Sequence, residues 1–524
     1  MNSFHLLRHA ALSAFALFAL IPTAAAENTA FSAALDSITA TELYEHVDVL
    51  ADDTLEGRAA GSRGGQAAAR YIETRLRKIG ATPAGENGRF TQLFYGSYRN
   101  LLARVDGSDE RLNQEYLVVG AHFDHVGYGT AQTSYGPLGY IHNGADDNAS
   151  GVAVLLETIE AIKKLPQPPR RTIVFAFWDG EEQGLLGSKH WVRRPTVPLS
   201  AVRLAINIDM VGRMRDGRLE LSGSRSGYGM RSLLASRSLP SGLWLHYDWE
   251  LRENSDHWSF FERGIPVALL HTGLHDDYHR PSDDVERINK QGMHRAAAYL
   301  FDLVHRAANA EALPAFRSHA GSESPSTRRV AERPLDPLPP RLGITFKDDP
   351  FWSTADLPGA PPAPPEPGIV VLTVAPRSAA AAAGLKTGDR IELVNGAPFA
   401  DADRFLQLVQ AQPAESTLLV RRDGVSEPLH LDVRLAGTPL RLGIAWREDP
   451  AEPDSVYLVR VVPGSSAAAA DLRVHDRIYH VNSQPFRGRN GFTVLLNERL
   501  DRNEPLTLTI ERHGRIWDTT VRLP

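Results

Sequence analysis

The sequence contains no cysteine, and this absence limits its chemistry. Without cysteine the chain forms no disulfide, holds no iron–sulfur cluster, offers no thiol nucleophile and carries no lipid-anchor cysteine. A metal ion bound by this protein must therefore take its side-chain ligands from His, Asp and Glu.

An excess of charge of one sign is also lacking. The 524 residues include 57 Lys and Arg against 63 Asp and Glu, so the net charge is −6. A chain so nearly balanced has no overall electrostatic attraction to nucleic acid or to an anionic membrane. Its 42% hydrophobic and 23% charged residues are ordinary for a folded protein. At roughly 150 residues per domain, the length predicts about three domains.

A long apolar run occurs only near the start of the chain. Arg8 precedes apolar residues from Ala10 to Ile21, and the small residues Ala24–Ala26 follow. This pattern predicts a signal peptide over residues 1–26 and a periplasmic or secreted protein with no membrane segment after cleavage. The alternative is a membrane anchor, which needs about 18 to 20 apolar residues and a stop-transfer flank. The lack of cysteine fits a cytosolic enzyme equally well, so the expected localisation depends on the signal.

Residues 27–315 alternate between helical and strand-like patterns. This predicts an α/β domain with a mostly parallel central sheet flanked by helices. Apolar side chains recur at helical spacing across Asn148–Leu165, which predicts an amphipathic crossover helix. Three continuous apolar runs predict strands that are buried on both faces, namely Tyr116–Ala121, Thr172–Trp178 and Leu204–Ile208.

Residues 316–340 are rich in Ser, Pro and Arg, and they predict an interdomain linker. After them the sequence repeats itself. RLGITFKDDP at 341–350 returns as RLGIAWREDP at 441–450, with six of ten positions identical. The repetition predicts two tandem β-rich domains, at residues 341–437 and 438–524.

The order of signals in each repeat resembles a PDZ domain of bacterial proteases. An RLGI entry is followed by an Ala-rich short helix, a glycine turn and a strand containing Val-Asn. In the second repeat, Asp471 and His475 replace the turn glycines Gly384 and Gly388. Glycine readily adopts positive φ, so we expect the second repeat to turn differently or with strain.

The resemblance implies that each PDZ-like domain captures a C-terminal peptide as an added strand. Backbone N–H groups near Leu342–Ile344 and Leu442–Ile444 would hold the peptide carboxylate. A second interpretation stands beside it: the two domains only space, dimerise or solubilise the remainder of the chain. The sequence leaves this choice and the oligomeric state open.

Acidic and imidazole side chains gather where the predicted strands end. His122 and Asp124 follow the first strand, Glu181 and Glu182 the second, and Asp209 the third. The loop before the crossover helix carries the sequence GADDNASG at 144–151. Loops at the carboxyl ends of parallel strands form one crevice, so we expect these side chains to converge.

Together with DYHRPSD at 277–283, these motifs closely resemble the M28 family of zinc-dependent exopeptidases over about 270 residues. The family series runs H-x-D, G-x-x-D-N-x-S-G, E-E, D-M-x-G and Y-H-x-P-x-D. The resemblance implies two zinc ions, one bound by His122 and Asp209, the other by Glu182 and His279. Asp147 would bridge them, because the register of the motif favours it over Asp146. Co²⁺ and Mn²⁺ suit the same ligands.

The resemblance also implies three catalytic roles. Glu181 would act as general base toward a metal-bound water, so that a metal-bound hydroxide attacks the peptide bond. Tyr278 would donate a hydrogen bond to the developing oxyanion. Asp124 would orient His122 through its other ring nitrogen.

Four further histidines lie close to these motifs without falling on a motif position. We interpret them as surface or capping residues; they are His125, His142, His271 and His275. His275 and His279 would share one face of a helix, as in HExxH proteases. The missing Glu after His275 and the adjacent Pro281 favour a loop instead. Ser255-Asp256-His257 also resembles a family segment, without an assigned role.

The implied function is that of a secreted di-zinc aminopeptidase acting on peptides with a free N-terminus. A carboxypeptidase and a glutaminyl cyclase on the same fold are alternatives, and the full two-metal ligand set weakens the cyclase interpretation. A different class is a PDZ-based peptide-binding protein with secondary hydrolase activity. Every motif position is filled, which argues against a degenerate hydrolase domain.

Overall fold

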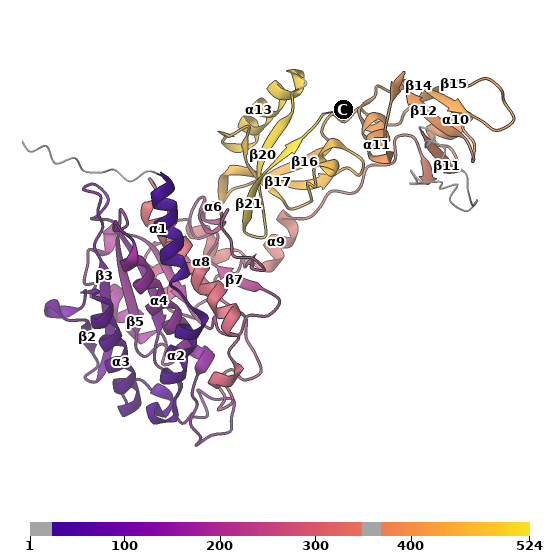
Figure 1. Cartoon of the computed structure of the whole chain (residues 1–524). Helices are drawn as coiled ribbons and strands as arrows, with labels where there is room; N and C mark the ends of the chain where they lie inside the picture. Colours follow the sequence, from indigo (N-terminus) through magenta and orange to yellow (C-terminus); the bar gives the residue numbers. More distant parts are fainter. Residues whose placement is uncertain (1–23, 348–367, 503, 524) are drawn as a thin grey trace, which may run out of the picture.

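The computed structural model describes residues 24–347, 368–502 and 504–523 (Figure 1). Most of the expected signal peptide lies outside these residues, so its cleavage and export of the protein stay predictions. Within the described ranges, no helix combines the length and apolarity that crossing a membrane requires. Figure 1 shows a large α/β unit and two small β-rich units, with the second repeat (yellow) between the α/β unit and the first repeat (orange).

The α/β unit is built on a nine-stranded mixed sheet in the order β1-β3-β5-β4-β6-β9-β7-β8, with β2 beside β3. Its centre is parallel and consists of β5 (Thr172–Trp178), β4 (Tyr116–His122), β6 (Val202–Ile208) and β9 (Val267–His271). On one side, the outer strands β1 (Thr82–Pro83), β2 (Thr91–Phe94) and β3 (Tyr98–Val105) form antiparallel pairs. On the other side, β7 (Arg218–Ser222) is antiparallel to β9 and parallel to the edge strand β8 (Trp244–Tyr247). The α/β class and all three predicted strands are confirmed.

Helices cover both faces of this sheet. The longer ones are α1 (Ala24–Asp36), α2 (Ala40–Leu50), α3 (Arg63–Ile79), α4 (Gly151–Lys164) and α8 (Lys290–Asn309). The shorter ones are α5 (Leu186–Arg193), α6 (Met230–Leu234) and α7 (His257–Phe261). The predicted crossover helix is confirmed as α4, which follows a single π-helical turn at Ala145–Ser150.

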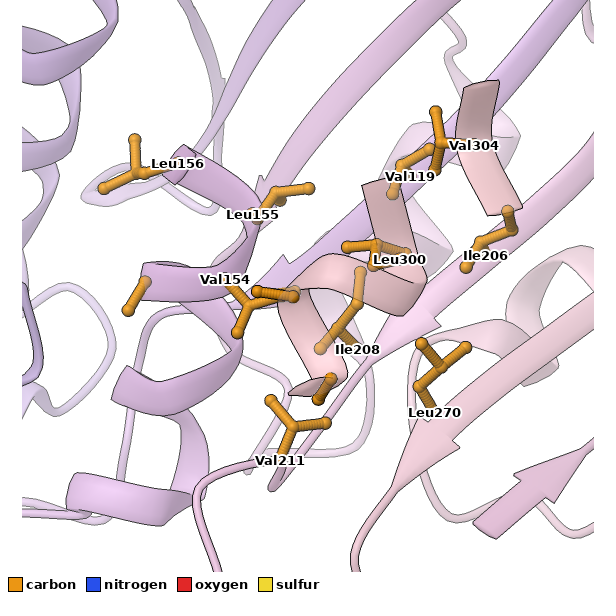
Figure 2. Close-up of a cluster of buried hydrophobic side chains, with 14 of the residues drawn as sticks. Val119, Val154, Leu155, Leu156, Ile206, Ile208, Val211, Leu270, Leu300 and Val304 are labelled. Carbon is orange, nitrogen blue, oxygen red and sulfur yellow. The ribbon is translucent and has the colours of Figure 1, made fainter. Parts of the chain in front are cut away.

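The central strands are continuously apolar because both of their faces are buried. Val119 of β4 packs in the cluster that includes α4 and α8, whereas Val118 belongs to the cluster on the opposite face. Figure 2 shows the first cluster, where Val154 and Leu300 from the two helices lie over the sheet. This packing fixes the strand ends that carry the polar motifs.

The two repeats have the same fold. The first contains β10 (Ile344–Lys347), β11 (Ile369–Val374), β12 (Arg390–Val394), β13 (Ala397–Pro398), β14 (Glu415–Arg421) and β15 (Leu429–Arg434), with α10 (Ala379–Ala382) and α11 (Ala402–Ala411). The second contains β16 (Ile444–Asp449), β17 (Glu452–Val461), β18 (Arg477–Val481), β19 (Gln484–Pro485), β20 (Leu506–Arg512) and β21 (Arg515–Val521), with α12 (Ser466–Ala469) and α13 (Gly488–Arg502). Their strand orders correspond one to one.

The expected strain in the second repeat is confirmed. Gly384 and Gly388 have φ of 78° and 89°, and the replacing residues Asp471 and His475 have φ of 56° and 76°. The second repeat thus makes the same left-handed turns without glycine, at a cost of order 1–3 kcal/mol for each residue. Asp471 accepts hydrogen bonds from Arg512, which help to hold its turn.

The segment predicted as a linker is partly helical and packs between the α/β unit and the second repeat. Helix α9 (Pro325–Ala331) starts after Ser324, whose hydroxyl accepts the N–H of Thr327. Arg328 of this helix donates to the carbonyl of Tyr247 at 2.9 Å. Tyr457 of the second repeat donates to the carbonyl of Ala331 at 2.6 Å.

Two hairpin turns of the second repeat dock directly on the α/β unit. In the β20–β21 turn, the carbonyl of His513 accepts the N–H of Leu245 at 2.9 Å, so the turn covers the free edge of β8. Gly514 has φ of 85°, and a Cβ there would lie 2.3 Å from Leu245 Cγ, so the close approach requires glycine. In the β16–β17 turn, Glu452 accepts the N–H of Arg231 at 2.7 Å.

Buried ion pairs complete this interface. Arg225 of the α/β unit pairs with Asp449 at 2.7 Å, and Asp449 also pairs with Arg477 at 2.8 Å. Arg231 pairs with Glu511 at 2.9 Å. Both carboxylates are at most 1% exposed. Breaking the Arg231–Glu511 pair would leave Glu511 buried without an ion-pair partner, and breaking the Arg225–Asp449 pair would leave Asp449 with Arg477 alone.

The interface predicts an unusual dependence of stability on pH. Burial raises the pKa of Glu452 to about 8, so this carboxyl is protonated in the folded protein at pH 6. Its contribution to stability is complete below the pKa of an unfolded glutamic acid and is lost as the pH rises through about 8. Glu452→Gln is neutral at every pH. We therefore expect it to be more stable than wild type already at pH 6, by no more than about 2 kcal/mol, and to remove part of the loss between pH 6 and 9.

Denaturant unfolding at the two pH values measures this difference. Glu498→Gln, which removes an exposed carboxylate from the same repeat, should reproduce the wild-type pH profile. Parallel profiles for wild type and Glu452→Gln would show that Glu452 is already ionised at pH 6.

Candidate functional site

The structure brings together all five side chains predicted as metal ligands. His122 ends β4, Asp209 follows β6, and Glu182 lies in the loop after β5. Asp147 sits in the π-helical turn before α4, and His279 lies in the loop after β9. These loops all leave the carboxyl edge of the sheet, and for this reason residues far apart in the sequence meet there.

Their donor atoms form two overlapping groups, each able to hold a metal ion. His122, Asp147 and Asp209 form one group, in which the ligand atoms lie within 4.8 Å of one another. The other group meets the same criterion and consists of His125, Asp147, Glu182 and His279. Asp147 belongs to both groups.

The two oxygens of Asp147 face different imidazoles. Oδ1 lies 3.3 Å from Nε2 of His122, and Oδ2 lies 3.1 Å from Nε2 of His279. Asp146 instead accepts the N–H of Gly212 at 2.6 Å through Oδ1 and lies 3.2 Å from His275 through Oδ2. Asp147 is therefore the carboxylate placed to bridge the two groups.

The other ligand pairs are equally close. His122 Nε2 lies 3.3 Å from Asp209 Oδ1, and His279 Nε2 lies 3.1 Å from Glu182 Oε2. Burial alone would raise the pKa of Asp147, but the imidazoles of His125, His122 and His279 outweigh it and hold this pKa well below its usual range. His279 Nε2 is buried and makes no hydrogen bond of good geometry. A buried set of imidazole nitrogens and carboxylate oxygens fits divalent cations such as zinc.

His125 differs from its interpretation as a surface or capping residue. Its side chain is buried, with Nδ1 2.7 Å from Glu182 Oε1 and 3.8 Å from Asp147 Oδ2. Only its position next to the H-x-D motif signalled this role in the sequence. His142 is also buried, with hydrogen bonds to Ser134 and to the carbonyl of Tyr140.

His271 and His275 belong to neither of the two groups. His271 accepts the N–H of Gly273 at 2.7 Å. The loop expectation for His275 and His279 is confirmed, because residues 275–279 are not helical. His279 has φ of 52°, a left-handed conformation that is uncommon outside glycine and recurs at functional sites.

Three further residues hold the ligands in place. Fully buried Asp283 accepts the N–H of Asp147 at 3.0 Å, and Ser255 donates to Asp209 Oδ2 at 2.7 Å. Arg58 is also buried and donates to the carbonyls of Phe123 and Gly144, each at 2.9 Å. Burial lowers the pKa of Arg58 to about 10. Sequence reasoning left Asp283 and Ser255 without a role and missed Arg58, because its acceptors are backbone carbonyls.

Asp124 supports the loop that carries both glutamates. Its carboxylate accepts the N–H of Glu181 at 3.1 Å and that of Glu182 at 3.4 Å. Nδ1 of His122 lies 3.1 Å from the backbone carbonyl of Asp124 and 3.8 Å from its carboxylate. The backbone carbonyl is therefore the nearer acceptor for this imidazole.

A cavity of about 360 Å³ opens beside the two groups, and both Glu181 and Tyr278 line it. Glu181 belongs to neither group. The ring of Tyr278 stacks on that of His279, with centroids 3.9 Å apart. The cavity is also lined by Glu220, Ser222, Asp248, Glu250 and Arg252.

Curated relatives cover only part of this chain. Leupeptin-inactivating enzyme 1 of Streptomyces exfoliatus is 28% identical over 291 residues, which are 53% of this chain and 61% of that protein. Aminopeptidase YwaD of Bacillus subtilis (strain 168) is 29% identical over 38% of this chain and 43% of that protein. The chain thus spans less than two thirds of the length of these relatives.

Solved structures and family models complete the comparison. The aminopeptidase from Aneurinibacillus sp. strain AM-1 aligns with a TM-score of 0.43 and 18% identity, over 54% of this chain and 97% of that chain. Residues 100–304 match the model of peptidase family M28, and residues 370–422 and 432–511 each match a model of the PDZ domain. Residues 100–304 therefore belong to peptidase family M28, and the two repeats that follow them are PDZ domains.

Proposed function

We propose that this protein is a di-zinc aminopeptidase that removes residues from the free N-terminus of peptides. The observation that carries the proposal is the shared Asp147, whose two oxygens face two ligand groups beside the cavity that holds Glu181. His122 and Asp209 would hold one ion, and Glu182 and His279 the other. Relatives named as aminopeptidases support the same activity.

The zinc pair would supply an acidified water and polarise the carbonyl of the peptide bond. Glu181 takes the proton of the attacking water and passes it to the leaving amine, since it lines the same cavity and is not itself a ligand. Burial raises the pKa of Glu181 well above its usual range, against the opposing charge of His122, which suits a group that carries a proton between two partners.

Tyr278 stabilises the charge that develops on the carbonyl oxygen. Burial first, and then the carboxylates of Asp147 and Glu182, raise the pKa of this phenol. Its hydroxyl therefore stays protonated and donates a hydrogen bond. Stacking on His279 fixes the ring beside the ligand groups.

The charge of the cavity favours an aminopeptidase over a carboxypeptidase. A carboxypeptidase needs a cation to bind the terminal carboxylate of its substrate. Among the described residues that line the cavity, Arg252 is the only one with a permanent positive charge, and it is paired with Glu250. The excess of carboxylates along the cavity suits a substrate ammonium group instead.

We further propose that the first PDZ domain recruits substrates by their C-terminal residues. Strand β10 lies at the end of its sheet, and no other described strand pairs with its outer edge, so this edge suits an added peptide strand. Phe346 of this strand packs on Phe405 of α11, with ring centroids 5.6 Å apart, which sets the distance between strand and helix.

Blocking either end of a peptide tests the direction of cleavage. We expect N-acetylation of a leucine-initiated tripeptide to lower kcat/KM by on the order of a hundredfold or more, because the cavity then lacks an ammonium partner. Amidation of the C-terminus should have little effect. Mass spectrometry of the products checks both. Cleavage of the acetylated peptide alone would indicate a carboxypeptidase. Loss of ammonia from a separate peptide that begins with glutamine would indicate a cyclase.

Substituting Glu181 and Glu182 one at a time distinguishes a role in proton transfer from a role in metal binding. Glu181→Gln should lower kcat by roughly a hundredfold to ten-thousandfold and keep the zinc content of wild type. Glu182→Gln, one residue away, should lose zinc as well as activity. Metal analysis and steady-state kinetics on the same samples measure both quantities, with chelator treatment and zinc readdition as the reference. Unchanged turnover in Glu181→Gln would rule out its role as base.

N-terminally labelled peptides that end in Val, Ala or Phe test recruitment. The label blocks cleavage, so binding is measured by fluorescence anisotropy on the full chain. We expect peptides with a free C-terminal carboxylate to bind and their C-terminal amides to lose this binding, because backbone N–H groups of the PDZ entry loop hold the carboxylate. Equal binding of acid and amide would support the spacer interpretation.

A further inference from the structure

One extended segment of the M28 domain lines the catalytic cavity with alternate side chains and buries the others. Tyr247, Trp249 and Leu251 are buried, at 3%, 5% and 7% exposure. The alternate residues Asp248 and Glu250 line the cavity. This period of two is that of a strand, and Asp248 continues the β7–β8 ladder by donating its N–H to the carbonyl of Leu221.

Two arginines hold the buried side of this segment, which we call the wall segment (residues 247–251). The guanidinium of Arg231 lies 4.1 Å from the ring centre of Tyr247, and that of Arg225 lies 3.7 Å from the ring centre of Trp249. Cation–π contacts are strongest where the groups are removed from water. Each arginine therefore contributes directly to the position of one ring.

The second PDZ domain holds both of these arginines. Glu511 pairs with Arg231, and Asp449 pairs with Arg225. Both carboxylates are buried, and each ion pair therefore fixes its guanidinium in a single orientation. Glu323, which precedes α9, completes the set around Arg225 at 2.6 Å. A chain of contacts thus runs from this PDZ domain through each arginine to a ring of the wall segment, and from there to a cavity carboxylate.

We propose that the second PDZ domain is a positioning element for substrate binding: through Arg225 and Arg231 it sets the wall segment and thereby the cavity carboxylates Asp248 and Glu250. The substrate class follows from the charge of this wall. Among the described residues, Asp248 has no ion-pair partner within 4.0 Å, so the wall favours peptides whose first side chain is cationic. This inference rests on the proposed aminopeptidase function.

The test compares Asp449→Asn with Asp389→Asn in the full chain. Asp389 of the first PDZ domain is equally buried at 1% exposure and pairs with Arg422 at 2.7 Å, within its own domain. Both variants thus remove one buried carboxylate from a PDZ domain. Only Asp449→Asn removes a partner of Arg225.

Aminoacyl p-nitroanilides of lysine and leucine serve as probes of the wall. We expect Asp449→Asn to raise KM for the lysine substrate about five- to tenfold, with kcat changed less than twofold and the leucine substrate little affected. Asp389→Asn should match wild type on both substrates. An equal loss on both substrates in Asp449→Asn, or no loss on either, would overturn the proposal.

Hydrogen exchange gives a readout that needs no activity. Backbone amides of residues 248–251 should lose protection in Asp449→Asn and keep it in Asp389→Asn, while β4 remains protected in both. Unchanged protection of the wall segment would overturn the proposal even if the protein proved to have another activity. If wild type showed no aminopeptidase activity but the exchange pattern were as expected, the proposed aminopeptidase function would be wrong and the positioning role of the second PDZ domain would stand. If Asp449→Asn fails to fold, Glu511→Gln tests the same chain of contacts through Arg231.

Discussion

The structure of the α/β unit depends on one electrostatic constraint: several carboxylates lie close together and largely out of contact with solvent. The carboxylates of Asp147, Glu182, Asp209 and Glu181 meet at one sheet edge, and burying an unpaired carboxylate costs far more than any single contact returns. Imidazole rings between the carboxylates offset this cost, and so do hydrogen-bonding residues that hold the carboxylates in place. Asp283 fixes the backbone that carries Asp147, and Ser255 fixes Asp209. Cations bound at Asp147 would complete the neutralisation.

The predictability of this site follows from where its residues stand in the chain. Strand β5 begins and ends where its apolar run does, because both of its faces are covered and no polar position interrupts it. The ligands could be predicted since each follows a strand of this kind. Arg58 could not, because four backbone carbonyls have no sequence pattern, and His125 could not, since its role depends on how the loop folds back toward Glu182.

The duplication shows a second limit of sequence reasoning. Both repeats and their strand order follow from recurring motifs, and even the strain at Asp471 and His475 follows from the missing glycines. The docking of the second repeat does not follow from them. It depends on hairpin tips, Asp449 and His513-Gly514, whose partners Arg225 and Leu245 lie more than 200 residues earlier. Neither composition nor periodicity relates residues that meet across such a separation.

This docking implies different roles for the two PDZ domains. A chain that ended before residue 341 would leave Arg225 without Asp449, Arg231 without Glu511, and the edge of β8 uncovered beside the catalytic cavity. Loss of activity in such a chain would follow from a displaced cavity wall as readily as from lost recruitment. The two roles separate only when the second PDZ domain stays docked. The first PDZ domain is therefore the place to test for peptide capture, and the second is structurally part of the unit that contains the M28 domain.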